Sequence, residues 1–160
     1  MSKTKLKKTY TLLTIDPGLA HTGWAYGPSG NPVPTDHGVS HFICPPERQR
    51  IACVSSVESL LNLFVPDRVV IEGVSFWSSS PRSAAMHGQG GAQQLSYAIG
   101  EVIAICRAGK IEIEDVDVRT WKGQLTPHAL AAAIKRSIGI QYSPHEREAV
   151  GIRLWKLDML

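Results

Sequence analysis

The amino-acid sequence predicts an α/β fold in which a five-stranded mixed sheet carries helices on both faces. Residues 12–15 and 69–71 are short apolar runs, and each ends on a carboxylate close to a glycine. Runs that are apolar throughout and rich in β-branched residues are typical of central strands in a covered, largely parallel sheet. Elsewhere, apolar residues recur at helical spacing, as expected for helices that connect such strands.

The first part of the chain predicts three strands joined by short turns. Residues 10–16 form the first strand, which ends at the Pro17-Gly18 turn. Residues 21–26 follow as the second strand. Residues 38–43 are the third, reached through a proline-rich turn at 31–34. We expect these three strands to form an antiparallel meander.

The rest of the chain predicts helices alternating with two further strands. Helices are expected at residues 46–64, 82–108 and 127–137 and from residue 143 onward, and strands at 68–72 and 111–116. Three meandering strands followed by two strands between helices is the order of a ribonuclease H-like fold. In that fold the first and fourth strands are parallel neighbours.

Composition limits the class of protein. The 160 residues with 43% hydrophobic content suit one domain, expected at residues 10–160 behind a basic arm at residues 1–9. No apolar run approaches the roughly 20 residues of a membrane helix, and no signal core follows the N-terminus, so we expect a cytoplasmic protein without membrane contact. Three cysteines without a CxxC pair suit reduced structural thiols.

The basic arm accounts for the positive charge of the chain. Four lysines lie in the first eight residues, and the formal net charge of the whole chain is +3. A basic arm on a near-neutral domain suits a nucleic-acid partner. The alternative is a solvated tail that only aids solubility.

Two carboxylates mark a candidate metal site. If the first and fourth strands are parallel neighbours, Asp16 and Glu72 emerge side by side at the carboxyl edge of the sheet, where open α/β sheets place their sites. Paired carboxylates repel each other unless a proton or cation lies between them. A divalent metal there points to phosphoryl-transfer chemistry. The alternative for Asp16 is an Asp-Pro-Gly turn in which the side chain caps its own backbone.

The last predicted helix adds further candidate ligands. Ser143 and Glu146 have the spacing of a capping box, which makes Glu146 structural. His145 and Glu148 lie three residues apart and share one helix face. Directed at Asp16 and Glu72, they would complete a four-residue metal site. The alternative is a polar first turn exposed to solvent.

Several segments together resemble the RuvC-type Holliday junction resolvases. The similar segments are TIDPGLAHTGWA at residues 14–25, VVIEGV at 69–74, SAAMHGQ at 83–89 and HEREAVGI at 145–152. Their order and spacing match the family over residues 11–155. The segment RTWKGQL at residues 119–125 is similar to phage-encoded members in particular.

The resemblance implies a metal-binding catalytic set. Carried over by position, the set comprises Asp16, Glu72, His145 and Glu148, and it would hold two Mg²⁺ or Mn²⁺ ions. One ion would activate the attacking water and the other would stabilise the leaving 3′-oxygen. Imidazole suits Mn²⁺ better than Mg²⁺, so we expect good activity with manganese. Glu148 stands where the family has Asp, which leaves Glu146 open as the last ligand.

The resemblance also implies DNA-contacting residues. Lys122 matches a basic residue near the scissile phosphate, and Arg82 at the start of the long helix is a further expected contact. The family stacks an aromatic residue on bases at about the place of Phe76 and Trp77, and Phe76 is the favoured candidate. The alternative is a core contact beneath the serine-rich loop.

The function implied is a structure-selective endonuclease that resolves four-way DNA junctions as a homodimer. Two alternatives remain open: a non-catalytic junction-binding module, and a related nuclease acting on other branched DNA or on RNA–DNA hybrids. A zinc site at His37, His41 and Cys44 is not expected, because their spacing fits no common structural pattern.

Overall fold

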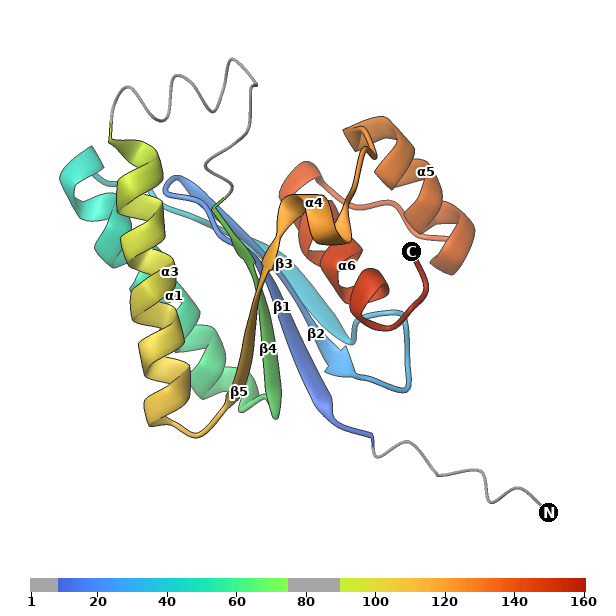
Figure 1. Ribbon diagram of the computed structural model, residues 1–160, viewed down its shortest axis with the longest axis horizontal. Helices are drawn as coiled ribbons and strands as arrows, with labels where there is room; N and C mark the ends of the chain where they lie inside the picture. The colour runs from blue at the N-terminus through green and yellow to red at the C-terminus, as the bar shows by residue number, and fades with distance from the viewer. Residues whose placement is uncertain (1–8, 75–89) are drawn as a thin grey trace.

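The computed structural model describes residues 9–74 and 90–160, which form a mixed sheet with helices on both faces (Figure 1). The strands are β1 (Thr11–Asp16), β2 (His21–Pro28), β3 (Asp36–His41), β4 (Arg68–Gly73) and β5 (Glu112–Asp117). Their order in the sheet is β3-β2-β1-β4-β5. β1 pairs antiparallel with β2 and parallel with β4, as the sequence predicts.

The described helices, apart from α4, also follow the sequence pattern closely. They are α1 (Pro46–Phe64), α3 (Gly91–Ala108), α4 (Val118–Trp121), α5 (Pro127–Ile138) and α6 (Pro144–Lys156). α5 begins after Thr126, whose hydroxyl accepts a hydrogen bond from the Ala129 N–H. The part of the long predicted helix before Gly91 lies outside the described residues, apart from Gly90.

Three features of the described residues differ from the sequence prediction, and the first is that β2 ends at Pro28 instead of Tyr26. β3 begins and ends two residues earlier than expected, because Asp36 pairs with Tyr26 and the Thr35 N–H closes the hairpin on the Tyr26 carbonyl at 2.8 Å. The short helix α4 was not predicted at all. It starts where the Asp117 carboxylate accepts a hydrogen bond from the Arg119 N–H at 2.7 Å, and four residues carry too little periodicity to reveal a helix.

The two faces of the sheet bury alternate residues of the central strands. Leu13 and Ile15 of β1 pack with α1 and α3, whereas Leu12 of β1 and Val70 of β4 pack with α5 and α6. Figure 1 shows α1 and α3 on one face and α4, α5 and α6 on the other. Even-numbered positions of β1 and β4 therefore face α6.

α6 is fixed tightly to the centre of the sheet. The buried Thr14 hydroxyl donates to the Ala149 carbonyl of α6 at 2.8 Å. Gly23 of β2 lies against the first turn of α6, where a Cβ would stand 2.2 Å from the His145 carbonyl oxygen. The N-terminal turns of α6 are thus held at the carboxyl end of β1. Within the described residues, no helix is long and apolar enough to cross a membrane.

Candidate active site

The four predicted ligands come from three elements that meet at the carboxyl edge of the sheet. β1 and β4 run parallel with Ile15 opposite Ile71, so Asp16 and Glu72 follow side by side. Both occupy even-numbered positions and face α6. His145 and Glu148 lie in the first turns of α6, over the same edge. The strand register thus brings Asp16 and Glu72 together, and α6 places His145 and Glu148 over the same edge.

His145 approaches Asp16 and is backed by a second histidine. Its Nδ1 lies 3.5 Å from Asp16 Oδ2. The His145 ring is 5.0 Å from the His21 ring, centroid to centroid. The Nδ1 atoms of His21 and His41 lie 2.9 Å apart across β2 and β3. Burial and the neighbouring His145 and His41 lower the pKa of His21, which favours a neutral imidazole beside the site.

Glu148 is paired with Lys122. The Lys122 ammonium lies 2.6 Å from Glu148 Oε2, and each side chain is only 16% exposed. Arg147 Nη2 lies 4.0 Å from the other carboxylate oxygen of Glu148. Lys122 follows α4 directly, so the short helix brings its ammonium to Glu148.

Glu72 is the most strongly perturbed group of the site. Burial raises its pKa from 4.5 to about 8, and the charges of Asp16 and Glu148 act in the same direction. The Trp121 indole N–H donates to Glu72 Oε2 at 2.8 Å and acts against that rise in pKa. A buried carboxylate among like charges is stabilised either by a proton or by a cation.

Glu146 is directed elsewhere. It accepts the Ser143 N–H at 3.1 Å in the predicted capping box, and His37 Nδ1 lies 2.9 Å from Glu146 Oε1. Its pKa is lowered, first by the hydrogen bond from the Ser143 hydroxyl. Its carboxylate therefore stabilises the start of α6, while Glu148 lies with Glu72 and Lys122.

The donor set suits a hard divalent cation, although it is not closed around one point. Three carboxylates and an imidazole are ligands that Mg²⁺ and Mn²⁺ accept. In the described part of the chain, no three His, Cys, Asp or Glu side chains are arranged to hold one ion. Glu148 is instead bonded to Lys122, and Glu72 to Trp121. A bound cation would replace or complement these protein donors.

The remaining predicted site residues have different outcomes. Phe76, Trp77 and Arg82 lie outside the described residues. Of the residues considered for a zinc site, His37 contacts Glu146 and His41 contacts His21. Sequence reasoning missed Trp121 as a contact of Glu72. Its only signal was its place next to Lys122 in the segment at 119–125.

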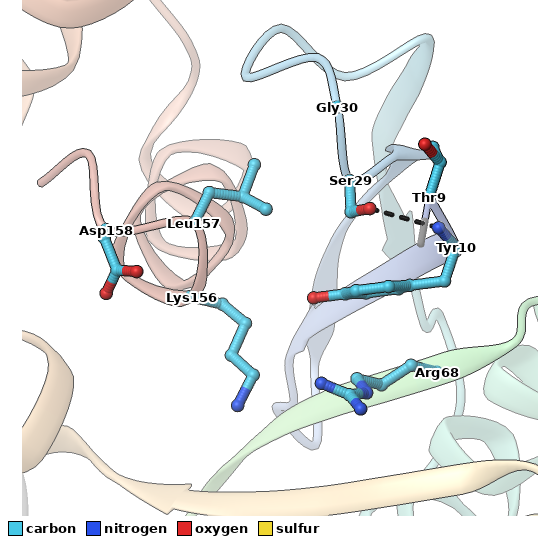
Figure 2. A pocket seen from close by; sticks show the side chains of 8 residues that line it. All are labelled: Thr9, Tyr10, Ser29, Gly30, Arg68, Lys156, Leu157 and Asp158. Atoms are coloured by element: carbon cyan, nitrogen blue, oxygen red, sulfur yellow. Dashed lines mark hydrogen bonds between the residues drawn. The ribbon is translucent and has the colours of Figure 1, made fainter. Parts of the chain in front are cut away.

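A cavity of about 370 Å³ lies at the opposite, amino edge of the sheet, where β1 and β4 begin and α6 ends (Figure 2). Its lining residues are Thr9, Tyr10, Ser29, Gly30, Arg68, Lys156, Leu157 and Asp158. The Arg68 guanidinium lies 4.6 Å from the centroid of the Tyr10 ring and binds Glu112, while Lys156 binds Glu114. Because its cations are already paired, this cavity is a weaker candidate than the carboxyl edge.

Comparison with known proteins gives structural neighbours only. No protein-family model matches the chain, and no curated protein sequence matches it. Thermus thermophilus RuvC in complex with a Holliday junction substrate has a TM-score of 0.65 and 16% identity over 91% of both chains. A second Thermus thermophilus RuvC structure gives a TM-score of 0.63 and 16% identity, covering 91% of this chain and 92% of that one.

A third neighbour extends the likeness beyond bacteria. The yeast mitochondrial Holliday junction resolvase Ydc2 has a TM-score of 0.57 and 9% identity, covering 92% of this chain and 81% of that one. At these identities the likeness establishes the fold. The predicted fold class is therefore confirmed, with the mixed five-stranded sheet at its centre.

Proposed function

We propose that this chain is a divalent-metal-dependent endonuclease that cuts four-way DNA junctions. The observation that carries the proposal is the convergence of Asp16, Glu72, His145 and Glu148 at one edge of the sheet. A fold shared with a protein solved on a Holliday junction supports the choice of substrate. We further propose that the chain acts as a homodimer, since a four-way junction offers two symmetric strands to cut.

The four converging residues would hold the metal, Mg²⁺ or Mn²⁺, with two ions per site. When bound, such ions activate a water for attack on the phosphodiester and stabilise the leaving oxygen. Glu72 is half-buried among like charges, so a nearby cation favours its ionised form and it would serve as a ligand. Glu148 would exchange its bond to Lys122 for the metal.

Lys122 would then be free to contact the DNA. Once Glu148 binds metal, the ammonium beside it can bind a phosphate oxygen and offset the charge that develops there. His145, held between Asp16 and His21, would complete the donor set with an imidazole nitrogen. Phe76, Trp77 and Arg82 remain proposed contacts to bases and backbone at the centre of the junction.

The proposal is tested by incubating the purified protein with a synthetic four-way junction in Mn²⁺ and with linear duplex built from the same arms. We expect paired symmetric nicks in the junction that are absent on duplex and absent with EDTA. Glu72→Gln is expected to abolish cleavage and to keep junction binding. Tight binding without nicks under any divalent metal would make the chain a junction-binding module instead. Light scattering with and without junction DNA tests the homodimer.

A further inference from the structure

We propose that Trp121 is a positioning residue, which holds one oxygen of Glu72 so that the other oxygen is directed to the metal. This inference rests on the proposed function, because it concerns a ligand of the proposed metal site. Its first support is the hydrogen bond from Trp121 Nε1 to Glu72 Oε2 at 2.8 Å. Orienting contacts of this kind commonly fix carboxylate ligands in metal sites.

The indole ring itself has little freedom. Trp121 is 3% exposed and belongs to the core cluster between the sheet and α6. A Cβ added at Gly151 of α6 would lie 2.8 Å from Trp121 Cζ3 and 3.1 Å from Leu130 Cδ1. The ring therefore packs directly on the backbone of the helix that carries His145 and Glu148, and the position of its N–H is set by that packing.

The route of the chain brings the indole to Glu72. β4 and β5 are parallel neighbours with Glu72 opposite Val116, and the chain turns into α4 immediately after β5. The Asp117 cap starts this short helix, which ends at Trp121. The next residue, Lys122, binds Glu148. One short turn of chain thus contacts two of the four proposed ligands.

The consequence for metal binding follows from carboxylate geometry. A carboxylate with one oxygen held by a fixed donor has lost most of its rotational freedom, so less entropy is lost when a cation binds the other oxygen. Without the hydrogen bond from the indole, the Glu72 carboxylate can rotate toward a neighbouring protonated carboxyl group or toward solvent. Removing the indole N–H is therefore expected to weaken metal binding about 10- to 100-fold.

A structural interpretation competes with this one. Buried tryptophans usually find an acceptor for their N–H, and Glu72 would then only satisfy the indole. The two interpretations differ in what happens when the N–H is removed and the ring volume is kept. If Trp121 only fills the core, its replacement changes stability and leaves the metal affinity of the folded protein unchanged.

The test is calorimetric titration of Mn²⁺ into the full chain and into Trp121→Phe, at fixed pH and without DNA. Trp155→Phe serves as the matched control, because Trp155 packs on the same core cluster near the opposite end of α6 from His145 and Glu148. We expect a Mn²⁺ dissociation constant about 10- to 100-fold higher for Trp121→Phe and unchanged for Trp155→Phe. Circular dichroism and junction binding in EDTA show whether each variant is folded.

A second variant tests the inference if Trp121→Phe does not fold. Gly151→Ala keeps the indole but forces its ring away from α6, because the new Cβ would lie 2.8 Å from a ring carbon. Weaker Mn²⁺ binding is again expected. If a folded Trp121→Phe or Gly151→Ala protein binds Mn²⁺ with the same dissociation constant as the parental chain, the inference is wrong. The proposed function is not affected by that result. A parental chain that binds no Mn²⁺ would overturn both the inference and the proposed function.

Discussion

The pKa of Glu72 reflects the burial and the charged groups around its side chain. Its side chain lies among Asp16, Glu148 and the Trp121 indole, and burial raises its pKa to about 8. Without a cation this environment therefore favours the protonated form of Glu72. A bound divalent cation favours the ionised form and removes the cause of the shift.

The raised pKa predicts how stability depends on pH in the absence of metal. Between about pH 4.5 and pH 8 the unfolded chain loses the Glu72 proton while the folded chain keeps it. The folded state binds more protons in that window. The contribution of Glu72 to the unfolding free energy is therefore complete below pH 4.5 and is lost as pH rises toward 8. Thermal unfolding in EDTA should show this decline, and Glu72→Gln should remove part of it. Equal pH profiles for the two proteins would contradict the prediction.

The two glutamates of the last helix are predicted to have separate roles. Glu148→Gln removes the charge that lies beside Glu72 and Lys122, and we expect cleavage to fall at least about 100-fold. Glu146→Ala removes the capping box and the contact to His37, so we expect cleavage to persist with a loss of about 1 kcal/mol in unfolding free energy. Cleavage assays measure the activity of both variants, and urea titrations measure their unfolding free energy. Loss of cleavage in Glu146→Ala with retained cleavage in Glu148→Gln would make Glu146 the ligand.

Individual elements differ in how far the sequence determines them. The apolar runs of β1 and β4 and the capping box of α6 are local patterns, and they predict the edge at which Asp16 and Glu72 meet. α4 has no such pattern, because its place depends on the cap at Asp117 and on packing against Gly151. The contact between Trp121 and Glu72 spans 49 positions of the chain and was therefore not predicted.

The first turn of α6 depends on a glycine in a neighbouring strand. A Cβ at Gly23 would lie 2.2 Å from the His145 carbonyl oxygen and 2.6 Å from its carbon. Because both are backbone atoms, Gly23→Ala must displace the turn that carries His145. We expect a loss of about 1–3 kcal/mol in unfolding free energy and a marked loss of cleavage.

Gly100 offers a matched control for that substitution. It lies inside α3, and a Cβ there would meet nothing within 4 Å. Gly100→Ala should raise the unfolding free energy by about 0.5–1 kcal/mol, because alanine is the better helix former. Thermal unfolding and cleavage of both variants measure the contrast. A Gly23→Ala protein with parental stability and activity would show that α6 does not depend on this contact.

At the scale of the whole molecule, one buried arginine connects the helix of the site to the far end of the meander. Arg153 of α6 is fully buried, and its guanidinium donates to the carbonyls of Pro28 and Asn31 at 2.6 Å and of Gly27 at 3.2 Å. Within residues 9–74 and 90–160, the hydrogen bonds of its guanidinium go to main-chain carbonyls. Burial lowers its pKa to about 10, so the group remains charged at neutral pH.

Replacing this arginine should loosen the connection between α6 and the β2–β3 turn. Arg153→Lys keeps the charge, but one ammonium cannot reach the carbonyls that the planar guanidinium binds together. Unsatisfied buried carbonyls and a poorly solvated charge should cost about 3–5 kcal/mol in unfolding free energy. Urea unfolding measures this loss, with the exposed Arg136→Lys of α5 as a control expected to change by less than about 0.5 kcal/mol. Equal losses in the two variants would contradict a special role for Arg153. A selective loss would show that the helix bearing His145 and Glu148 is fixed at both ends, by Gly23 near the carboxylates and by Arg153 at the opposite edge of the sheet.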